Sequence, residues 1–147
     1  MRKIFTIGSS KKGLRQFVNL LKAANVTNLI DVRLNNTSQL SGFAKKEDLS
    51  FILELIGINY IHDPTLAPDS GLLNDYKKGK VTWSEYELRY YDILESRNIK
   101  VRFKEIIGDG IPVFLCSEEK ATKCHRRLLA EYIQNHLLEE VQVIHLS

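Results

Sequence analysis

The chain has 147 residues, of which 44% are hydrophobic and 27% are charged, a composition that is typical of one globular domain and excludes a disordered or coiled-coil chain. No apolar run is long enough to span a membrane and no signal-peptide core follows Met1, so we expect a soluble, cytoplasmic protein without a membrane partner. Lys and Arg number 21 against 18 for Asp and Glu, and the resulting net charge of +3 does not by itself indicate a nucleic-acid-binding protein.

The first half of the chain alternates between short apolar runs and helical patterns. The apolar runs predict strands at residues 4–8, 28–33 and 58–62. Apolar residues at helical spacing predict helices at residues 14–24 and 49–56. We expect Ser9 or Ser10 to cap the first helix, Gly57 to end the second, and residues 34–44 to form a loop.

The second half begins with a stretch, residues 63–80, whose proline, glycine and lysine content predicts a long loop. Thr82-Trp83-Ser84-Glu85 has the pattern of a capping box and predicts the start of a helix. The remaining expected elements are a short helix around 103–107, a strand at 112–116, a helix from about Lys123 to Leu138, and a strand at 141–146. This alternation predicts a single α/β domain over residues 1–147, a three-layer α/β/α sandwich with a mostly parallel sheet of about five strands.

Two of the predicted strands end in charged or reactive residues. In open α/β sheets ligands bind beyond the carboxyl ends of the strands, which makes Asp31-Val32-Arg33 and Cys116-Ser117-Glu118 candidate site segments. Asp31 and Arg33 alternate with Val32 and are therefore expected on the same side of the sheet. They form either a structural ion pair or an anion site, in which Arg33 binds the anion and Asp31 orients it or acts as a general base.

The segment after Glu118 contains two further candidates, Cys124 and His125. Thr122 is a plausible N-cap, which places both residues in the first helical turn, where the backbone N–H groups and the helix dipole favour anions. The same field is expected to lower the pKa of the Cys124 thiol. On the helical wheel, Arg126 is expected to border the site and Arg127 to face water.

Cys116, Cys124 and His125 allow three interpretations. A thiol can act as a nucleophile with His125 as its base, the three residues can supply three of the four ligands that zinc prefers, or they can be buried packing residues. Their spacing matches no known zinc-finger or ribbon pattern, and no glycine-rich nucleotide loop is present, so the sequence predicts no metal and no other cofactor. His62, near the end of the third strand, is a further candidate at the same edge.

Five short motifs occur in one order along almost the whole chain: Thr6-Ile7-Gly8, Leu29-Ile30-Asp31-Val32-Arg33, Leu115-Cys116-Ser117-Glu118, Cys124-His125-Arg126-Arg127-Leu128 and Ile144-His145-Leu146. Together they resemble the domain-of-unknown-function 488 family, DUF488. The resemblance implies a compact α/β/α domain and supplies no reaction. It also implies that the acidic, basic and thiol residues of these motifs belong to one site. The chain departs from many members at Ser9, where they carry histidine.

The leading hypothesis is an enzyme-like pocket at the carboxyl edge of the sheet that binds an anionic substrate, a nucleotide or a nucleic-acid phosphate. The catalytic candidates are Asp31, Cys116, Glu118, Cys124 and His125. The substrate-binding candidates are Ser9, Arg33, His62 and Arg126. The alternative is a non-catalytic module that binds nucleic acid through this edge and the lysines of residues 77–80, or a regulatory interaction domain. The sequence does not predict the oligomeric state.

Overall fold

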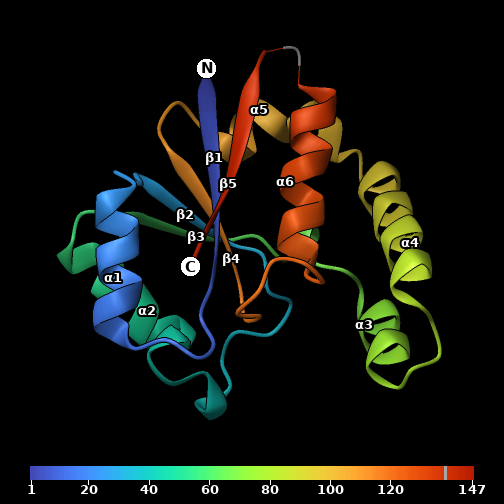
Figure 1. Cartoon of the computed structure of the whole chain (residues 1–147), viewed down its shortest axis with the longest axis horizontal. Coiled ribbons are helices and arrows are strands. Elements are labelled where there is room, and N and C mark those ends of the chain that lie inside the picture. The colour runs from blue at the N-terminus through green and yellow to red at the C-terminus, as the bar shows by residue number, and fades with distance from the viewer. Residues whose placement is uncertain (138) are drawn as a thin grey trace.

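The computed structural model describes residues 1–137 and 139–147 (Figure 1). The strands are β1 (Arg2–Gly8), β2 (Asn28–Asp31), β3 (Asn59–His62), β4 (Pro112–Cys116) and β5 (Val141–Leu146). The α-helices are α1 (Leu14–Ala23), α2 (Lys46–Leu55), α3 (Ser70–Lys77), α4 (Trp83–Ser96), α5 (Phe103–Ile107) and α6 (His125–His136). Three short 3₁₀ helices are η1 (Gln39–Ala44), η2 (Pro64–Leu66) and η3 (Ile99–Arg102). No helix in the described ranges is long and apolar enough to cross a bilayer.

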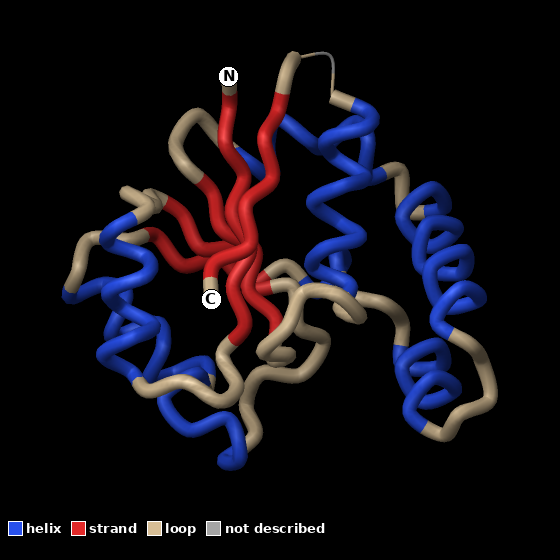
Figure 2. Tube along the Cα trace, viewed as in Figure 1, coloured by secondary structure: helices blue, strands red, loops and turns tan. Residues whose placement is uncertain are grey.

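All strand pairs are parallel, and the strand order is β3-β2-β4-β1-β5. Helices α1 and α2 cover one face of this sheet, and α4, α5 and α6 pack on the other (Figures 1 and 2). The structure therefore confirms the predicted α/β/α sandwich.

The alternation of side chains along each strand produces two separate hydrophobic cores. On β1, Ile4 packs in the core beneath α4, α5 and α6, whereas Phe5 and Ile7 pack in the core beneath α1 and α2. The central strand β4 is buried along its whole length, which explains why its sequence is a continuous apolar run. At the end of β4, Cys116 lies on the α6 side of the sheet.

The strand order creates a topological switch point between β2 and β4. The chain leaves β2 through α2 towards the β3 edge of the sheet, and it leaves β4 through α6 towards the β5 edge. Connections between parallel strands are right-handed, so the direction in which the chain crosses the sheet decides which face the connecting helix covers. Because the connections after β2 and β4 run in opposite directions, α2 and α6 lie on opposite faces of the sheet. The two loops therefore diverge at the carboxyl ends of β2 and β4, which is where ligands bind in open α/β sheets.

The expectation of a long loop over residues 63–80 is wrong. This stretch contains η2 and α3, and the Asp69 side chain caps α3 by accepting a hydrogen bond from Leu72 N. Its two prolines both precede α3, so they delimit this helix and do not interrupt it. Leu72 and Tyr76 lie four residues apart and turn one face of α3 towards α4.

One helix start agrees with expectation and two differ in detail. The capping box of Thr82 and Glu85 is confirmed at the start of α4. Helix α1 begins after Gly13 and not after Ser9 or Ser10, and α6 begins after Cys124 and not after Thr122. The expected end of the last helix at Leu138 lies outside the described residues. The segment over 34–44 is irregular in its first part and then forms η1.

Candidate functional site

A pocket of about 260 Å³ opens at the switch point between β2 and β4. Five of the residues predicted from the sequence line it: Arg33, Cys116, Glu118, Cys124 and His125. A larger hollow of about 660 Å³ lies around Arg2, Lys104 and His136, where β1 begins and α6 ends. Because ligands of parallel sheets bind at the carboxyl ends of the strands, the smaller pocket is the better candidate.

Arg33 is almost completely buried and is held by Asp31. Its Nε and Nη2 donate to the two carboxylate oxygens of Asp31 at 2.8 and 2.7 Å, and Nη2 also donates to the Ala44 carbonyl at 2.8 Å. The third nitrogen, Nη1, is buried and has no hydrogen-bond partner among the described residues. A buried guanidinium N–H without an acceptor is costly, and this nitrogen is available to donate a further hydrogen bond.

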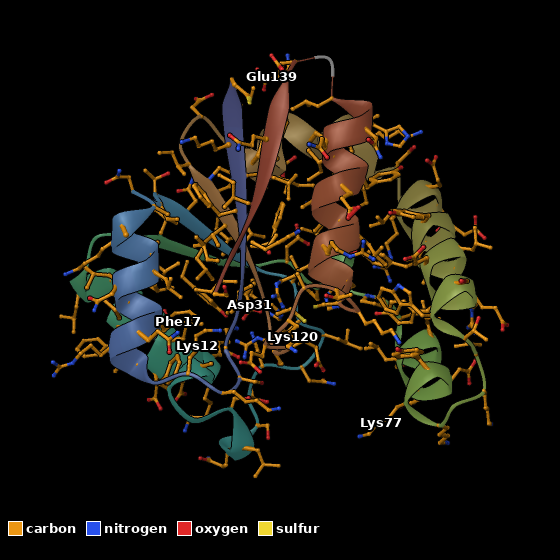
Figure 3. All side chains as sticks on the ribbon, viewed as in Figure 1. Lys12, Phe17, Asp31, Lys77, Lys120 and Glu139 are labelled. Carbon is orange, nitrogen blue, oxygen red and sulfur yellow. The ribbon has the colours of Figure 1, made fainter. Side chains whose placement is uncertain are left out.

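Asp31 lies inside the molecule between the helical layers (Figure 3) and accepts further hydrogen bonds from Tyr60 Oη at 2.6 Å and Asn36 Nδ2 at 3.1 Å. Burial by itself raises the pKa of this carboxyl, but the hydrogen bonds and charge of Arg33, with those of Tyr60 and Asn36, outweigh it and hold the pKa below its ordinary value. A carboxylate with this many donors orients Arg33 and has little capacity to act as a base.

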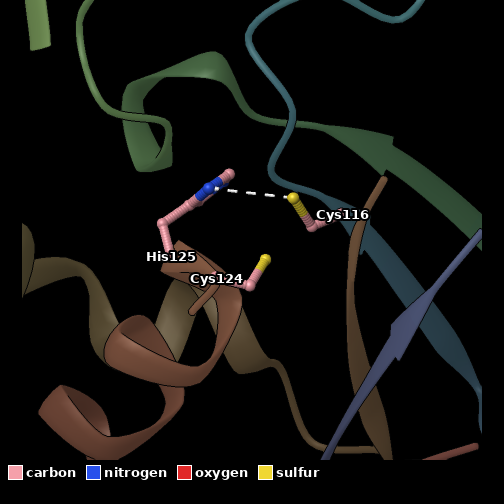
Figure 4. Close-up of side chains that lie close together, drawn as sticks. All are labelled: Cys116, Cys124 and His125. Atoms are coloured by element: carbon pink, nitrogen blue, oxygen red, sulfur yellow. Dashed lines mark hydrogen bonds between the residues drawn. The ribbon is translucent and has the colours of Figure 1, made fainter. Parts of the chain in front are cut away.

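Cys116, Cys124 and His125 form a buried cluster on the α6 side of the sheet (Figure 4). Their side-chain sulfur and nitrogen atoms all lie within 4.8 Å of one another, and Cys116 Sγ lies 3.7 Å from His125 Nδ1. His125 Nε2 lies 2.8 Å from the Val32 carbonyl oxygen. Because a carbonyl only accepts, we assign the ring proton to Nε2, which leaves the Nδ1 lone pair directed towards the thiols.

The two thiols differ in acidity, and the order is the reverse of the expected one. A hydrogen bond from Cys124 lowers the pKa of Cys116, burial opposes this, and the backbone N–H groups of Glu118 and Ser117 lower it further. The same contact with Cys116, together with burial, raises the pKa of Cys124 well above its ordinary value. The expectation of an acidic Cys124 is therefore wrong, because the neighbouring thiol and burial outweigh the helix dipole.

Arg126 does not line the pocket, contrary to the expectation that it borders it. It is buried and donates to the carbonyls of Glu118 and Glu119 at 2.5 and 3.2 Å, and its Nε donates to Thr6 Oγ1 at 3.2 Å. Arg126 therefore fixes the loop that follows Cys116. Gly8 allows this loop to approach β1, because a Cβ atom at this position would overlap the Glu118 carbonyl.

Arg127 also differs from the expectation of a freely solvated side chain. It is half-buried and pairs with Glu87 at 3.2 Å and with Glu131 at 3.3 Å. These contacts connect α6 to α4 outside the pocket.

The other candidates lie at or near the pocket in different ways. Glu118 is exposed at its rim. His62 Nε2 lies 2.8 Å from the Arg33 carbonyl, so this histidine supports the segment after β2. Ser9 donates its backbone N–H to the Cys116 carbonyl at 3.1 Å, and it lines a separate depression with Lys12.

The pocket has an aromatic wall that was not predicted from the sequence. Tyr76 from α3 and Trp83 and Tyr86 from α4 line it, with ring centroids 4.9 Å apart for Trp83 and Tyr86 and 5.0 Å apart for Tyr76 and Tyr86. Tyr86 is buried, whereas Tyr76 and Trp83 are half-buried and keep part of their surface accessible. The helical spacing of Trp83 and Tyr86 indicated packing alone, because the position of α3 beside them was not predicted.

Comparison with known proteins identifies a family. The family model DUF488, described as a domain of unknown function, matches residues 13–133, a range that includes the segments after β2 and β4 and most of α6. No curated protein and no solved structure matches the chain.

Proposed function

The chain belongs to the DUF488 family of domains of unknown function, and we propose that its pocket binds a nucleotide through the phosphate, as the substrate site of an enzyme. The observation that carries the proposal is the unpartnered Nη1 of Arg33. Asp31 holds the other two nitrogens of this guanidinium, so the group is pre-organised before any ligand arrives. A phosphate oxygen would supply the missing acceptor in a charge-assisted hydrogen bond.

Two further features of the pocket favour an anion. The first turn of α6 begins at the pocket with His125, and a helix N-terminus stabilises negative charge. Lys123, an exposed residue that precedes α6, also lines the pocket.

Glu118 at the rim is the one acidic side chain among the residues that line this pocket, and we propose it as the proton donor or acceptor.

The aromatic wall supports a ligand with a planar ring. Trp83 and Tyr76 are half-buried, so each presents part of its ring to the pocket, and a nucleobase stacks on such surfaces. A pocket of about 260 Å³ is slightly smaller than the roughly 300–1,000 Å³ of typical small-molecule sites, which favours a mononucleotide over a larger cofactor.

The binding experiment compares nucleoside 5′-monophosphates with the corresponding nucleosides by titration calorimetry. We expect Arg33→Lys, which keeps the charge and loses Nη1, to weaken monophosphate binding about ten-fold or more, equivalent to about 1.4 kcal/mol. The nucleosides should bind weakly to both proteins. Arg127→Lys is the matched control outside the pocket. Equal monophosphate affinity in wild type and both folded variants would refute the role of Arg33.

A non-catalytic nucleic-acid module is the second candidate, because Lys77, Lys78 and Lys80 are exposed at the end of α3 next to Tyr76, with Lys77 pointing outward in Figure 3. The two candidates differ in how affinity depends on salt. Oligonucleotide binding through these lysines would fall steeply with salt concentration and would not require Arg33. Mononucleotide binding in the pocket would depend on Arg33 and much less on salt.

A further inference from the structure

The buried cluster of Cys116, Cys124 and His125 has the composition of a metal site. Two thiols and one imidazole are the ligands that zinc prefers, and all three side chains are buried. They come from two segments that the fold brings together, the end of β4 and the start of α6. The separation in sequence explains why spacing alone did not indicate a site.

The distance between the Cys116 sulfur and the His125 Nδ1 nitrogen fits a single ion bound to both atoms. Zinc–sulfur bonds of about 2.3 Å and zinc–nitrogen bonds of about 2.0–2.1 Å in a tetrahedron separate sulfur and nitrogen by roughly 3.6 Å and the two sulfurs by roughly 3.8 Å. The observed distance from Cys116 Sγ to His125 Nδ1 is 3.7 Å, and no pair in the cluster exceeds 4.8 Å. A separation of 3.7 Å is within the range of a thiol–imidazole hydrogen bond, the contact drawn as a dashed line in Figure 4, and it also matches an edge of this tetrahedron. A pair of ligand atoms at the 4.8 Å limit has to close by about 1 Å when the ion binds.

The surroundings of the cluster also match those of metal ligands. His125 donates Nε2–H to the Val32 carbonyl at 2.8 Å, the contact that fixes the tautomer and orientation of metal-binding histidines. This leaves Nδ1 free to coordinate.

We propose that Cys116, Cys124 and His125 bind a zinc ion through two thiolates and Nδ1, with the fourth position open to the pocket. All three ligands line the pocket together with Arg33, so a water molecule or an anionic oxygen of the ligand can complete the tetrahedron. The role of the fourth position rests on the proposed function. The binding of the ion by the three residues does not.

The first experiment uses the metal alone. The full chain is treated with a chelator to remove metal, is kept reduced with a phosphine, and is then titrated with Zn²⁺ and Co²⁺. We expect one ion per chain, a sulfur-to-cobalt charge-transfer band, and the intense visible bands of tetrahedral Co²⁺. Failure of Zn²⁺ to bind in competition with a micromolar-affinity indicator would overturn the proposal, as would a cobalt spectrum without the charge-transfer band.

The second experiment uses variants. Cys116→Ser, Cys124→Ser and His125→Gln should each weaken Zn²⁺ binding by at least a hundred-fold, because loss of a ligand exceeds the effect of losing a supporting residue. His136→Gln, at the other end of α6, is the matched control and should bind Zn²⁺ as the wild type does. Circular dichroism checks the fold of each variant. Undiminished Zn²⁺ binding in a folded variant of any of the three residues would overturn the assignment.

The metal and the nucleotide proposals fail separately. If the chain binds the monophosphate with dependence on Arg33 but binds no Zn²⁺, the metal site is wrong and the proposed function stands. If the chain binds one Zn²⁺ through the cluster but binds no monophosphate, the proposed function is wrong and the metal site stands. A Cys116–Cys124 disulfide formed without reductant and unaffected by added Zn²⁺ would also contradict the metal site, because bound thiolates are protected from oxidation.

Discussion

Replacing Asp31 with asparagine tests the ion pair that positions Arg33. Asp31 and Arg33 are both buried, and the substitution removes the negative charge that faces a guanidinium held by two hydrogen bonds of 2.7 and 2.8 Å. Breaking a buried pair by removing one partner costs about 3–5 kcal/mol of unfolding free energy, because the other charge stays buried. We expect Asp31→Asn to lose this amount in urea denaturation at pH 7. The exposed pair of Asp75 and Arg89 is the control, and Asp75→Asn should cost less than about 1 kcal/mol.

The effect of Asp31→Asn on the unfolding free energy should also depend on pH. The pKa of Asp31 in the folded state is held below its ordinary value of 3.8, so its contribution to stability is complete above pH 3.8 and is lost as the pH falls through the depressed folded value. The difference in unfolding free energy between wild type and Asp31→Asn should therefore shrink in acid below pH 3.8. A difference below about 1 kcal/mol at pH 7, or one that is unchanged in strong acid, would show that the ionised Asp31 does not stabilise the fold through Arg33.

Two further substitutions test the support of the loop after Cys116. Gly8→Ala should destabilise the fold by about 1–3 kcal/mol, because the new Cβ atom overlaps the Glu118 carbonyl. A Cβ atom at Gly13 meets no atom within 4 Å, so Gly13→Ala should be nearly neutral. Urea denaturation measures the unfolding free energy of both variants. Arg126→Lys should lower the melting temperature by several degrees because it loses hydrogen bonds to two loop carbonyls, and Arg127→Lys, which alters only partly exposed ion pairs, should change it little. A Gly8→Ala variant as stable as Gly13→Ala, or equal melting temperatures for the two arginine variants, would contradict this description of the loop.

The sequence carries enough information for the layers and for the location of the site. Each strand has a local apolar pattern, and the strand–helix alternation leaves a parallel sheet as the simplest arrangement. The carboxyl ends of parallel strands lie at one edge of the sheet. The segments that begin at Asp31 and Cys116 therefore lie next to each other if their two strands are neighbours in the sheet. The observed pairing of β2 with β4 places them side by side, but strand order depends on long-range contacts and has no local signature.

The roles of individual side chains could not be read from the sequence to the same extent. Arg33 follows β2 and Arg126 lies in the first turn of α6. Within the described residues Arg33 Nη1 has no partner, whereas the path of the loop after Cys116 gives Arg126 the carbonyls of Glu118 and Glu119. That path depends on the absence of a side chain at Gly8, a contact over more than a hundred residues of sequence. Tyr76 was missed for a similar reason, because α3 was concealed by the prolines and glycines around it.

A crystal structure of the chain with a nucleoside 5′-monophosphate is the strongest test of the proposed nucleotide site. The phosphate is expected within hydrogen-bonding distance of Arg33 Nη1, with the base against Trp83 in the pocket between β2 and β4. A phosphate in the separate depression beside Ser9 and Lys12, with the Arg33 pocket unchanged, would contradict the account.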